Sequence, residues 1–305
     1  MKYKIDNVRP SKLDTRDRLA KLPLIDNLPT AVDLKPWADE VEDQLSLGSC
    51  TANAGCSALE LAYNRAGIMK DFSRLYLYWY TRLLGGIAGD DGAYPRDIGK
   101  ALNKYGVCLE PTWEYIQSKV NIEPNMVAQT EAKEYPTLAY ERISGGPEFV
   151  ITNIKNALAL GIPVLTSLWI HESFMQLSGD WKTQTWDVEN SVENPVVGGH
   201  EVLIIGYDDE AQRFLAENSW GPGWGDGGFF GIPYSYIGIT IDEWWILTQI
   251  GVPYVPVNKE IQPLPPAPPP YIDEQTGLSP LMIKLMIAAA VALVVAVVTG
   301  GSFFG

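Results

Sequence analysis

The chain has 305 residues, of which 46% are hydrophobic and 11% aromatic, so it can bury the core of one large domain or of two lobes. This composition excludes an intrinsically disordered chain. The formal net charge of −14 argues against nucleic acid as a partner, because an acidic body repels phosphate backbones.

Residues 1–30 are predicted to form an extended basic arm. The segment is polar and contains three prolines, and residues 1–21 carry seven Lys/Arg against three Asp/Glu. Its start, "MKYKIDNVRPSKLDTRD", has no apolar core and is not typical of a secretory signal. We expect the arm to lie on the protein's own acidic surface rather than to bind an anionic partner.

The main body, residues 31–258, changes its hydrophobic pattern once. Helical patterns come first, in "CTANAGCSALELAYNRAG", "SRLYLYWYTRLLGG" and "PRDIGKALNKYG", and each stops at glycine, as helices often do. Strand-like runs follow, among them "PVLTSLWI", "HEVLIIGYD", "RFLAENSW", "GGFFGIP" and "DEWWILTQI". Helices before antiparallel strands predict an α+β protein, with a helical lobe over about 44–140 and a strand-rich lobe over about 141–258. We expect a functional site in the cleft between the two lobes.

The C-terminal part is predicted to be a Pro-rich linker, residues 259–277, followed by a hydrophobic segment, residues 278–305. The linker contains "IQPLPPAPPPY", which favours an extended spacer. In the hydrophobic segment, residues 281–299 carry Lys284 as their one charge, and as a helix they would span about 28 Å, close to a bilayer core of about 30 Å. We therefore expect a transmembrane helix and a membrane-associated protein. The alternatives are a helix buried in a partner assembly such as a virion, or a protein that is soluble in a host cytoplasm.

Cys50 is a candidate nucleophile. Ser49 is a good N-cap, and apolar residues follow at helical spacing, so Cys50 falls in a first helical turn, where unpaired N–H groups and the helix dipole lower a thiol's pKa. A buried core cysteine remains the alternative, and Cys56 and Cys108 are interpreted in that way. Three cysteines are too few for a disulfide framework, which favours a reducing interior or a virus-like particle.

A nucleophilic cysteine needs a base, and the chain has two histidines. His171 follows a strand without a polar partner pattern and is interpreted as structural. His200 opens an apolar strand after two glycines, so it faces either an edge or a cleft. Asn218 ends the next strand-like run, and an amide there can hold the imidazole in one tautomer.

Three segments together, "QLSLGSC", "GGHEVLIIGY" and "ENSWGPGWGDGGFF", resemble the papain-like cysteine peptidase family. The resemblance is greatest to its bacterial and viral branch, which reads "GSCTANA", and it extends over roughly residues 14–248. It implies a two-lobe papain-like fold with an antiparallel, β-barrel-like C-terminal lobe, here followed by the hydrophobic helix. It also implies a cysteine-type endopeptidase that binds a polypeptide substrate in a groove between the lobes, with no cofactor and no metal ion.

The resemblance implies catalytic roles for four residues. Cys50 would be the nucleophile and His200 its general base, while Asn218 would orient the imidazole. Gln44, six residues before Cys50, would form the oxyanion hole together with the Cys50 N–H group.

Two further residues would contact the site or the substrate. Trp220 would shield the hydrogen bond between histidine and asparagine from water, and Gly92 in "DDGAY" would pair its backbone with an extended substrate. The later glycines of "GPGWGDGGFF" also fit the dinucleotide pattern G-x-G-x-x-G. No helix is predicted after them, so they are interpreted as turn residues.

The sequence does not decide how the activity is controlled or which kind of bond the enzyme attacks. The stretch before Cys50 is too short for the helical inhibitory domain that zymogens of this family carry. Either the enzyme is made active, or the arm covers the groove, or location provides the control. Two alternative functions are a catalytically silent binding or structural module of the same fold, and a thiol amidohydrolase that acts on a non-protein amide.

Overall fold

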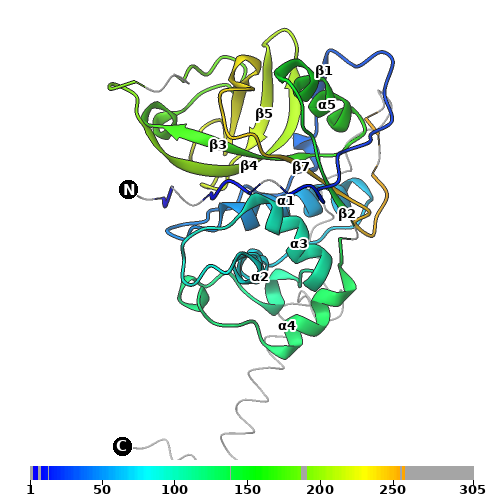
Figure 1. Ribbon diagram of the computed structural model, residues 1–305, viewed down its shortest axis with the longest axis vertical. Coiled ribbons are helices and arrows are strands. Elements are labelled where there is room, and N and C mark those ends of the chain that lie inside the picture. Colours follow the sequence, from blue (N-terminus) through cyan, green and yellow to red (C-terminus); the bar gives the residue numbers. More distant parts are fainter. Residues whose placement is uncertain are drawn as a thin grey trace, which may run out of the picture. The chain divides into compact units, whose positions relative to one another are not determined.

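The computed structural model describes residues 3–5, 8–12, 14–137, 139–186, 191–254 and 256–257 (Figure 1). The predicted Pro-rich linker over 259–277 and the hydrophobic segment over 278–305, with its predicted transmembrane helix over 281–299, lie outside these residues. Within the described ranges, no helix is both long and apolar enough to cross a bilayer.

The α-helices in the described part of the chain are α1 (Cys50–Arg65), α2 (Arg74–Gly85), α3 (Pro95–Tyr105), α4 (Met126–Glu131) and α5 (Pro147–Ala159). Short 3-10 helices are η1 (Lys35–Trp37), η2 (Glu110–Thr112), η3 (Gln117–Lys119), η4 (Ala132–Glu134), η5 (Glu172–Gln176) and η6 (Tyr234–Tyr236). Figure 1 shows α1 to α4 grouped below strands β3, β4 and β5, and α5 beside these strands, next to β1.

The ends of the helices follow from local sequence. The Ser73 side chain accepts a hydrogen bond from the Tyr76 N–H group at the start of α2, and Gly86 ends that helix with a φ of 64°. Pro95 occupies the first turn of α3, and Gly106 ends it with a φ of 69°. The glycine stops predicted for these two helices are therefore confirmed.

Helix α1 is the central helix of the molecule. Every residue of α1 except Ser57 is buried, because α2, α3 and the long strand β4 (Val196–Asp208) pack around it. The side chains at its N-terminus are therefore held by a rigid element rather than by a loop.

The strands form one antiparallel sheet with the order β2-β7-β3-β4-β5-β6, and β1 pairs with β4. The remaining strands are β1 (Ala31–Asp33), β2 (Ala139–Arg142), β3 (Val164–His171), β5 (Arg213–Glu217), β6 (Phe229–Pro233) and β7 (Trp244–Thr248). The pairing of β3 with β4 sets Leu168 opposite His200, which places this histidine on the central strand. The predicted α+β class, with helices before most of the antiparallel strands, is confirmed.

The sheet is open, which corrects the barrel-like shape expected for the strand-rich lobe. A barrel would require its end strands, β2 and β6, to pair. The outer edge of β2 is instead covered by the arm: the Ala20 N–H group donates to the Arg142 carbonyl at 2.8 Å, and the Arg142 N–H group donates to the Arg18 carbonyl at 2.8 Å. The arm therefore covers the strand edge that closure of the sheet would use.

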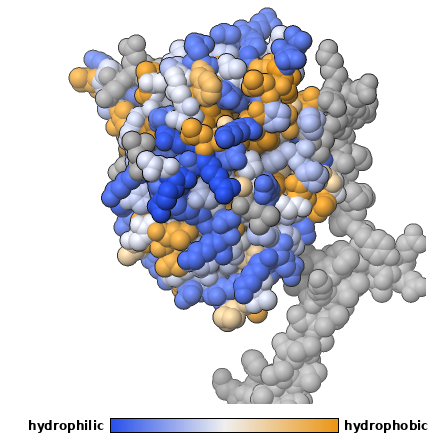
Figure 2. Space-filling model, turned by 45° about the vertical axis from the view of Figure 1, so that its right-hand side comes forward, coloured by the Kyte–Doolittle hydropathy of each residue, from blue (hydrophilic) through white to orange (hydrophobic). Residues whose placement is uncertain are grey.

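The outer surface is mainly hydrophilic on the face drawn in Figure 2, where hydrophobic residues form separate patches. This distribution is ordinary for a folded domain with a well-buried core.

Candidate active site

Cys50 lies at the start of α1 and is fully buried. Ser49 stands at the N-cap position, but its hydroxyl does not cap the helix. It lies 2.5 Å from the Tyr115 hydroxyl and accepts a hydrogen bond from the Asn53 side chain at 3.0 Å. The turn before the cysteine is thus held by side-chain contacts rather than by the cap expected from the sequence.

His200 and Asn218 are joined by a buried hydrogen bond of 2.7 Å between His200 Nε2 and Asn218 Oδ1. The Ser219 N–H group donates to the same Asn218 oxygen at 2.8 Å. Because an amide oxygen only accepts, Nε2 carries the proton and Nδ1 keeps the lone pair. Nδ1 is buried and has no hydrogen-bond partner among the described residues, so it can accept a proton.

The thiol and the imidazole come from different elements, α1 and β4, which pack against each other. A backbone hydrogen bond from Glu201, the residue after His200, acts on the Cys50 thiol. The fold therefore brings the helix that carries the candidate nucleophile against the strand that carries the candidate base, although 150 positions separate the two in the sequence.

Gln44 is buried, and hydrogen bonds hold both ends of its side-chain amide. The Ser219 hydroxyl donates to Gln44 Oε1 at 2.6 Å, and the Gln44 N–H group donates to the Ser219 carbonyl at 2.8 Å. Gln44 Nε2 donates to the Leu47 carbonyl at 2.8 Å and lies 3.5 Å from the Lys4 carbonyl oxygen. An amide donor is thus directed at a carbonyl of the arm.

Trp220 covers the imidazole. Its ring lies 4.9 Å from the His200 ring, tilted by 33°, and the Tyr3 ring stacks on the Trp220 ring at 4.8 Å. The Tyr3 hydroxyl donates to the Trp220 carbonyl at 2.7 Å. The indole and the phenol together exclude water from this side of the site.

Gly92 lies close to the site, but its N–H group donates to the Tyr78 hydroxyl at 3.1 Å. The neighbouring residue, Ala93, is the one whose backbone pairs with an extended segment. Its carbonyl accepts from the Arg9 N–H group at 3.1 Å, and it forms a parallel bridge with Val8.

The extended segment in the groove is the arm itself. Val8 packs with Cys50, Ile241 and Trp169 in one small apolar cluster, and its N–H group donates to the Gly199 carbonyl at 3.4 Å. Arm residues therefore lie over Cys50, which is the placement that one of the three possibilities left open by the sequence requires.

Burial under the arm keeps the thiol and the imidazole neutral. Burial raises the pKa of the Cys50 thiol to about 12, against backbone hydrogen bonds that favour the thiolate. Burial also lowers the pKa of His200 to about 4, although its hydrogen bond to Asn218 acts in the opposite direction. In the covered site both groups are consequently neutral near pH 7, rather than a thiolate and an imidazolium.

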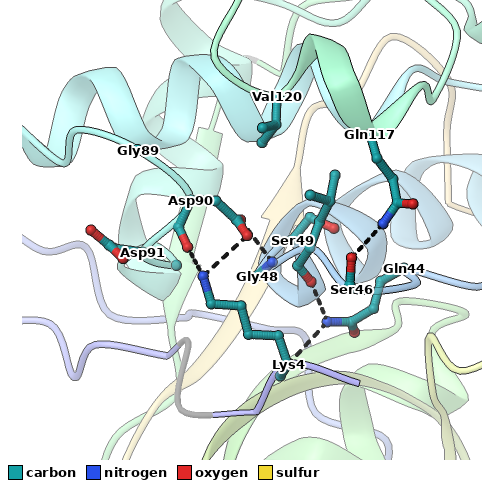
Figure 3. Close-up of polar contacts among 12 residues, drawn as sticks. Lys4, Gln44, Ser46, Gly48, Ser49, Gly89, Asp90, Asp91, Gln117 and Val120 are labelled. Atoms are coloured by element: carbon teal, nitrogen blue, oxygen red, sulfur yellow. Dashed lines mark hydrogen bonds and ion pairs between the residues drawn. The ribbon is translucent and has the colours of Figure 1, made fainter. Parts of the chain in front are cut away.

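A carboxylate at the edge of the site has no counterpart among the residues expected from the sequence. Asp90 Oδ1 accepts a hydrogen bond from the Gly48 N–H group at 2.8 Å, and Asp90 Oδ2 lies 3.1 Å from Lys4 Nζ (Figure 3). Asp90 Oδ1 also accepts from the Tyr78 hydroxyl at 2.7 Å. Its position in "DDGAY", two residues before Gly92, was the only available signal, and that signal does not identify Gly48 as a partner.

The other histidine and the other cysteines lie outside this group. His171 packs edge-on to Tyr236, and the Cys56 and Cys108 thiols are free and buried. In the part of the chain that the structure describes, no group of three or more His, Cys, Asp or Glu side chains could hold a metal ion. A buried thiol, a proton-accepting imidazole and a fixed amide donor together suit acyl transfer to sulfur.

Comparison with known proteins agrees with this chemistry. The sequence model of the papain family cysteine proteases matches residues 28–242. An uncharacterized peptidase C1-like protein of Acanthamoeba polyphaga mimivirus is 35% identical over 260 residues, which cover 82% of this chain and 79% of that protein. A cathepsin B-like protein of Giardia intestinalis is 26% identical over 199 residues, 63% of this chain and 64% of that protein.

The structure of xylellain, a cysteine protease from Xylella fastidiosa, superposes with a TM-score of 0.72 at 29% identity and covers 82% of this chain and 98% of that one. The family match spans most of the chain and includes both the helix of Cys50 and the strand of His200. This chain is therefore a member of the papain family of cysteine proteases, and its helices and antiparallel sheet form the papain-like fold.

Proposed function

We propose that the protein is an endopeptidase that hydrolyses peptide bonds through Cys50, His200 and Asn218, with Gln44 in the oxyanion hole. The observation that carries this proposal is the 2.7 Å hydrogen bond between His200 Nε2 and Asn218 Oδ1. It leaves Nδ1 as the proton acceptor on the strand that contacts the Cys50 thiol.

In the first half of the reaction, His200 Nδ1 takes the thiol proton and Cys50 Sγ attacks the carbonyl carbon of the substrate. The oxyanion that forms accepts hydrogen bonds from Gln44 Nε2 and from the Cys50 N–H group at the start of α1. As the tetrahedral intermediate collapses, the carbon–nitrogen bond breaks and the imidazolium gives its proton to the leaving amine.

In the second half, His200 removes a proton from water, and the resulting hydroxide attacks the thioester. The acid product leaves and the Cys50 sulfur takes back a proton. Asn218 holds the imidazole in place during both halves, while Trp220 keeps water from their hydrogen bond.

The way the arm lies in the groove favours a polypeptide substrate over a non-protein amide. The arm is an extended peptide, and its backbone bonds to the carbonyls of Ala93 and Gly199 on opposite sides of the groove. These carbonyls would accept hydrogen bonds from an extended peptide substrate in the same way. We assign the backbone pairing to Ala93, and Gly92 keeps its N–H group for Tyr78.

Labelling with an epoxysuccinyl thiol-protease inhibitor tests the proposal. We expect the full chain to gain one adduct at Cys50, located by peptide mass spectrometry, and to hydrolyse denatured protein substrates. Cys50→Ala should lose both properties, whereas Cys56→Ala, a change at the other cysteine of the same helix, should keep them.

Labelled Cys50 without hydrolysis of any peptide would support the silent binding module instead. Absence of an adduct, together with unchanged hydrolysis by Cys50→Ala, would contradict the nucleophile itself.

We further infer that the C-terminal segment tethers the peptidase to a membrane. This inference is supported by the apolar composition of residues 281–299. The full chain should float with phospholipid vesicles, and a chain with Leu293→Asp and Val294→Asp should remain in the soluble fraction. If the two chains distribute alike, membrane tethering by this segment is wrong.

A further inference from the structure

Lys4 of the arm contacts the site through both its backbone carbonyl and its side-chain ammonium (Figure 3). Its carbonyl oxygen lies 3.5 Å from Gln44 Nε2, the proposed oxyanion donor. Its ammonium lies 3.1 Å from Asp90 Oδ2 and also donates to the Asp90 carbonyl. One residue therefore has its carbonyl at the amide donor and its charged end on a carboxylate.

The Asp90 carboxylate is fixed in place by the protein body. Its Oδ1 atom accepts from the Gly48 N–H group, two residues before Cys50, and from the Tyr78 hydroxyl on α2. The Asp90 side chain is 19% exposed, so it is largely sheltered from water. Its Oδ2 atom is consequently held at a constant position relative to the loop that carries the nucleophile.

Among the described residues, Lys4 is the cation that forms an ion pair with Asp90, whereas Arg82 of the protein body interacts with this carboxylate without a hydrogen bond to it. Arg82 donates to the carbonyls of Gly89 and Val120 and, at 3.0 Å, to Asn121 Oδ1. The hydrogen bonds of its guanidinium are thus directed at neutral acceptors. Asp90 Oδ2 can therefore pair with an ammonium group of the peptide bound at the site, as it does with Lys4 of the arm.

In peptide hydrolysis, the residue whose carbonyl faces the oxyanion donors is the residue that becomes the acyl group. Lys4 places its carbonyl at such a donor and its ammonium on Asp90 at the same time. On the basis of the proposed function, we propose that Asp90 determines specificity by selecting a lysine or arginine side chain on the acyl side of the cleaved bond. The Lys4 side chain is 40% exposed in this position, which leaves room for the larger guanidinium.

Peptidyl acyloxymethyl ketones, which alkylate an active-site thiol, provide the test. Three probes differ only in the residue next to the ketone: lysine, arginine, or norleucine, which matches the lysine carbon chain without its charge. The rate of Cys50 adduct formation is measured by mass spectrometry in the full chain carrying Lys4→Met, so that the arm's own lysine does not compete. We expect the two basic probes to react about 10- to 100-fold faster than the norleucine probe.

Asp90→Asn in the same chain should reduce this ratio to near one, because asparagine keeps an oxygen for Gly48 and Tyr78 but removes the charge. Asp91→Asn is the matched control: it removes the same charge one residue away and should keep the ratio. A second measurement needs no variant of Asp90. High salt should lower the preference for basic probes, because a partly exposed ion pair is screened.

Equal rates for the three probes, a ratio that survives Asp90→Asn, or an equal loss in Asp91→Asn would each overturn the proposal, and Asp90 would then serve only as an anchor for the arm. Failure of all three probes to label Cys50 even in a chain that also carries Val8→Asp, which opposes arm binding over Cys50, would overturn the proposed function as well. An error in the proposed role of Asp90 can therefore be distinguished from an error in the proposed role of Cys50.

Discussion

At the scale of single residues, Gln44 shows how the site is prepared before a substrate arrives. Both ends of its side-chain amide are held, Oε1 by the Ser219 hydroxyl and Nε2 by the Leu47 carbonyl. We expect Gln44→Ala to lower kcat by about 10²- to 10³-fold with little change in KM, because the proposed donor would act on the oxyanion rather than on the bound substrate. Steady-state kinetics on one peptide substrate measures both constants.

Ser219→Ala is the matched variant for this prediction. It leaves Gln44 in place and removes the hydroxyl that holds Oε1, so we expect a smaller loss of kcat than in Gln44→Ala. An equal loss in the two variants, or a change confined to KM, would argue that Gln44 serves the structure of the site rather than the oxyanion.

The residues of the site differ in how far the sequence predicts them. The contact between His200 and Asn218 could be predicted, because the chain has two histidines and Asn218 ends the strand-like run that follows His200. Asp90 could not, because its importance lies in an N–H group of Gly48 and a hydroxyl of Tyr78, and no periodic pattern encodes such contacts.

At the scale of elements, the order of helices and strands was predictable because glycine stops and apolar runs are local signals. The path of the arm and the open sheet were not. Both depend on pairings between distant residues, such as Arg142 of β2 with Arg18 and Ala93 with Arg9. A polar segment rich in prolines gives no local indication of the strand edge or groove that it will cover.

The arm is the element whose removal from the groove should change reactivity most. Val8→Asp places a carboxylate in the apolar cluster of Val8, Cys50 and Ile241, which opposes arm binding. Because burial raises the pKa of Cys50 to about 12, re-exposure should lower that pKa and increase the thiolate fraction at neutral pH. The pH dependence of alkylation by iodoacetamide measures both effects.

Leu24→Asp is the control for arm composition, because Leu24 also belongs to the arm but is 77% exposed. Cys50 in this variant should be alkylated by iodoacetamide at the wild-type rate. If Val8→Asp also reacts at the wild-type rate over the whole pH range, the arm does not limit access to Cys50.

At the scale of the whole molecule, the net charge of −14 includes carboxyl groups that the fold buries. Glu60, Glu201, Glu217 and Glu243 are all buried, and burial raises the pKa of each. His200 acts in the opposite sense, because burial lowers its pKa to about 4 and the folded state loses stability as the histidine is protonated. The buried glutamates and His200 therefore change the free energy of unfolding in opposite directions as the pH rises. The contribution of one group is obtained by comparing the wild-type protein with a variant that lacks only that group.

Glu217 allows that comparison. Burial raises its pKa from the ordinary value of 4.5 to about 7, against a hydrogen bond from Ser57 that lowers it. Between these two values the unfolded chain releases a proton that the folded chain retains, so rising pH favours unfolding, and the loss is complete above the folded pKa. The Glu217 carboxyl should thus lower the free energy of unfolding by about 3 kcal/mol in mild alkali, and it should have no such effect in acid.

Glu217→Gln keeps the shape and removes the titration. We expect its free energy of unfolding, relative to wild type, to rise by about 3 kcal/mol between a pH below the ordinary glutamate pKa and a pH above the raised one. Urea denaturation of both proteins at the two pH values measures this difference, in which the contribution of His200 cancels. A difference that does not change with pH would mean that Glu217 is already ionised in the folded protein and that its burial is offset by contacts.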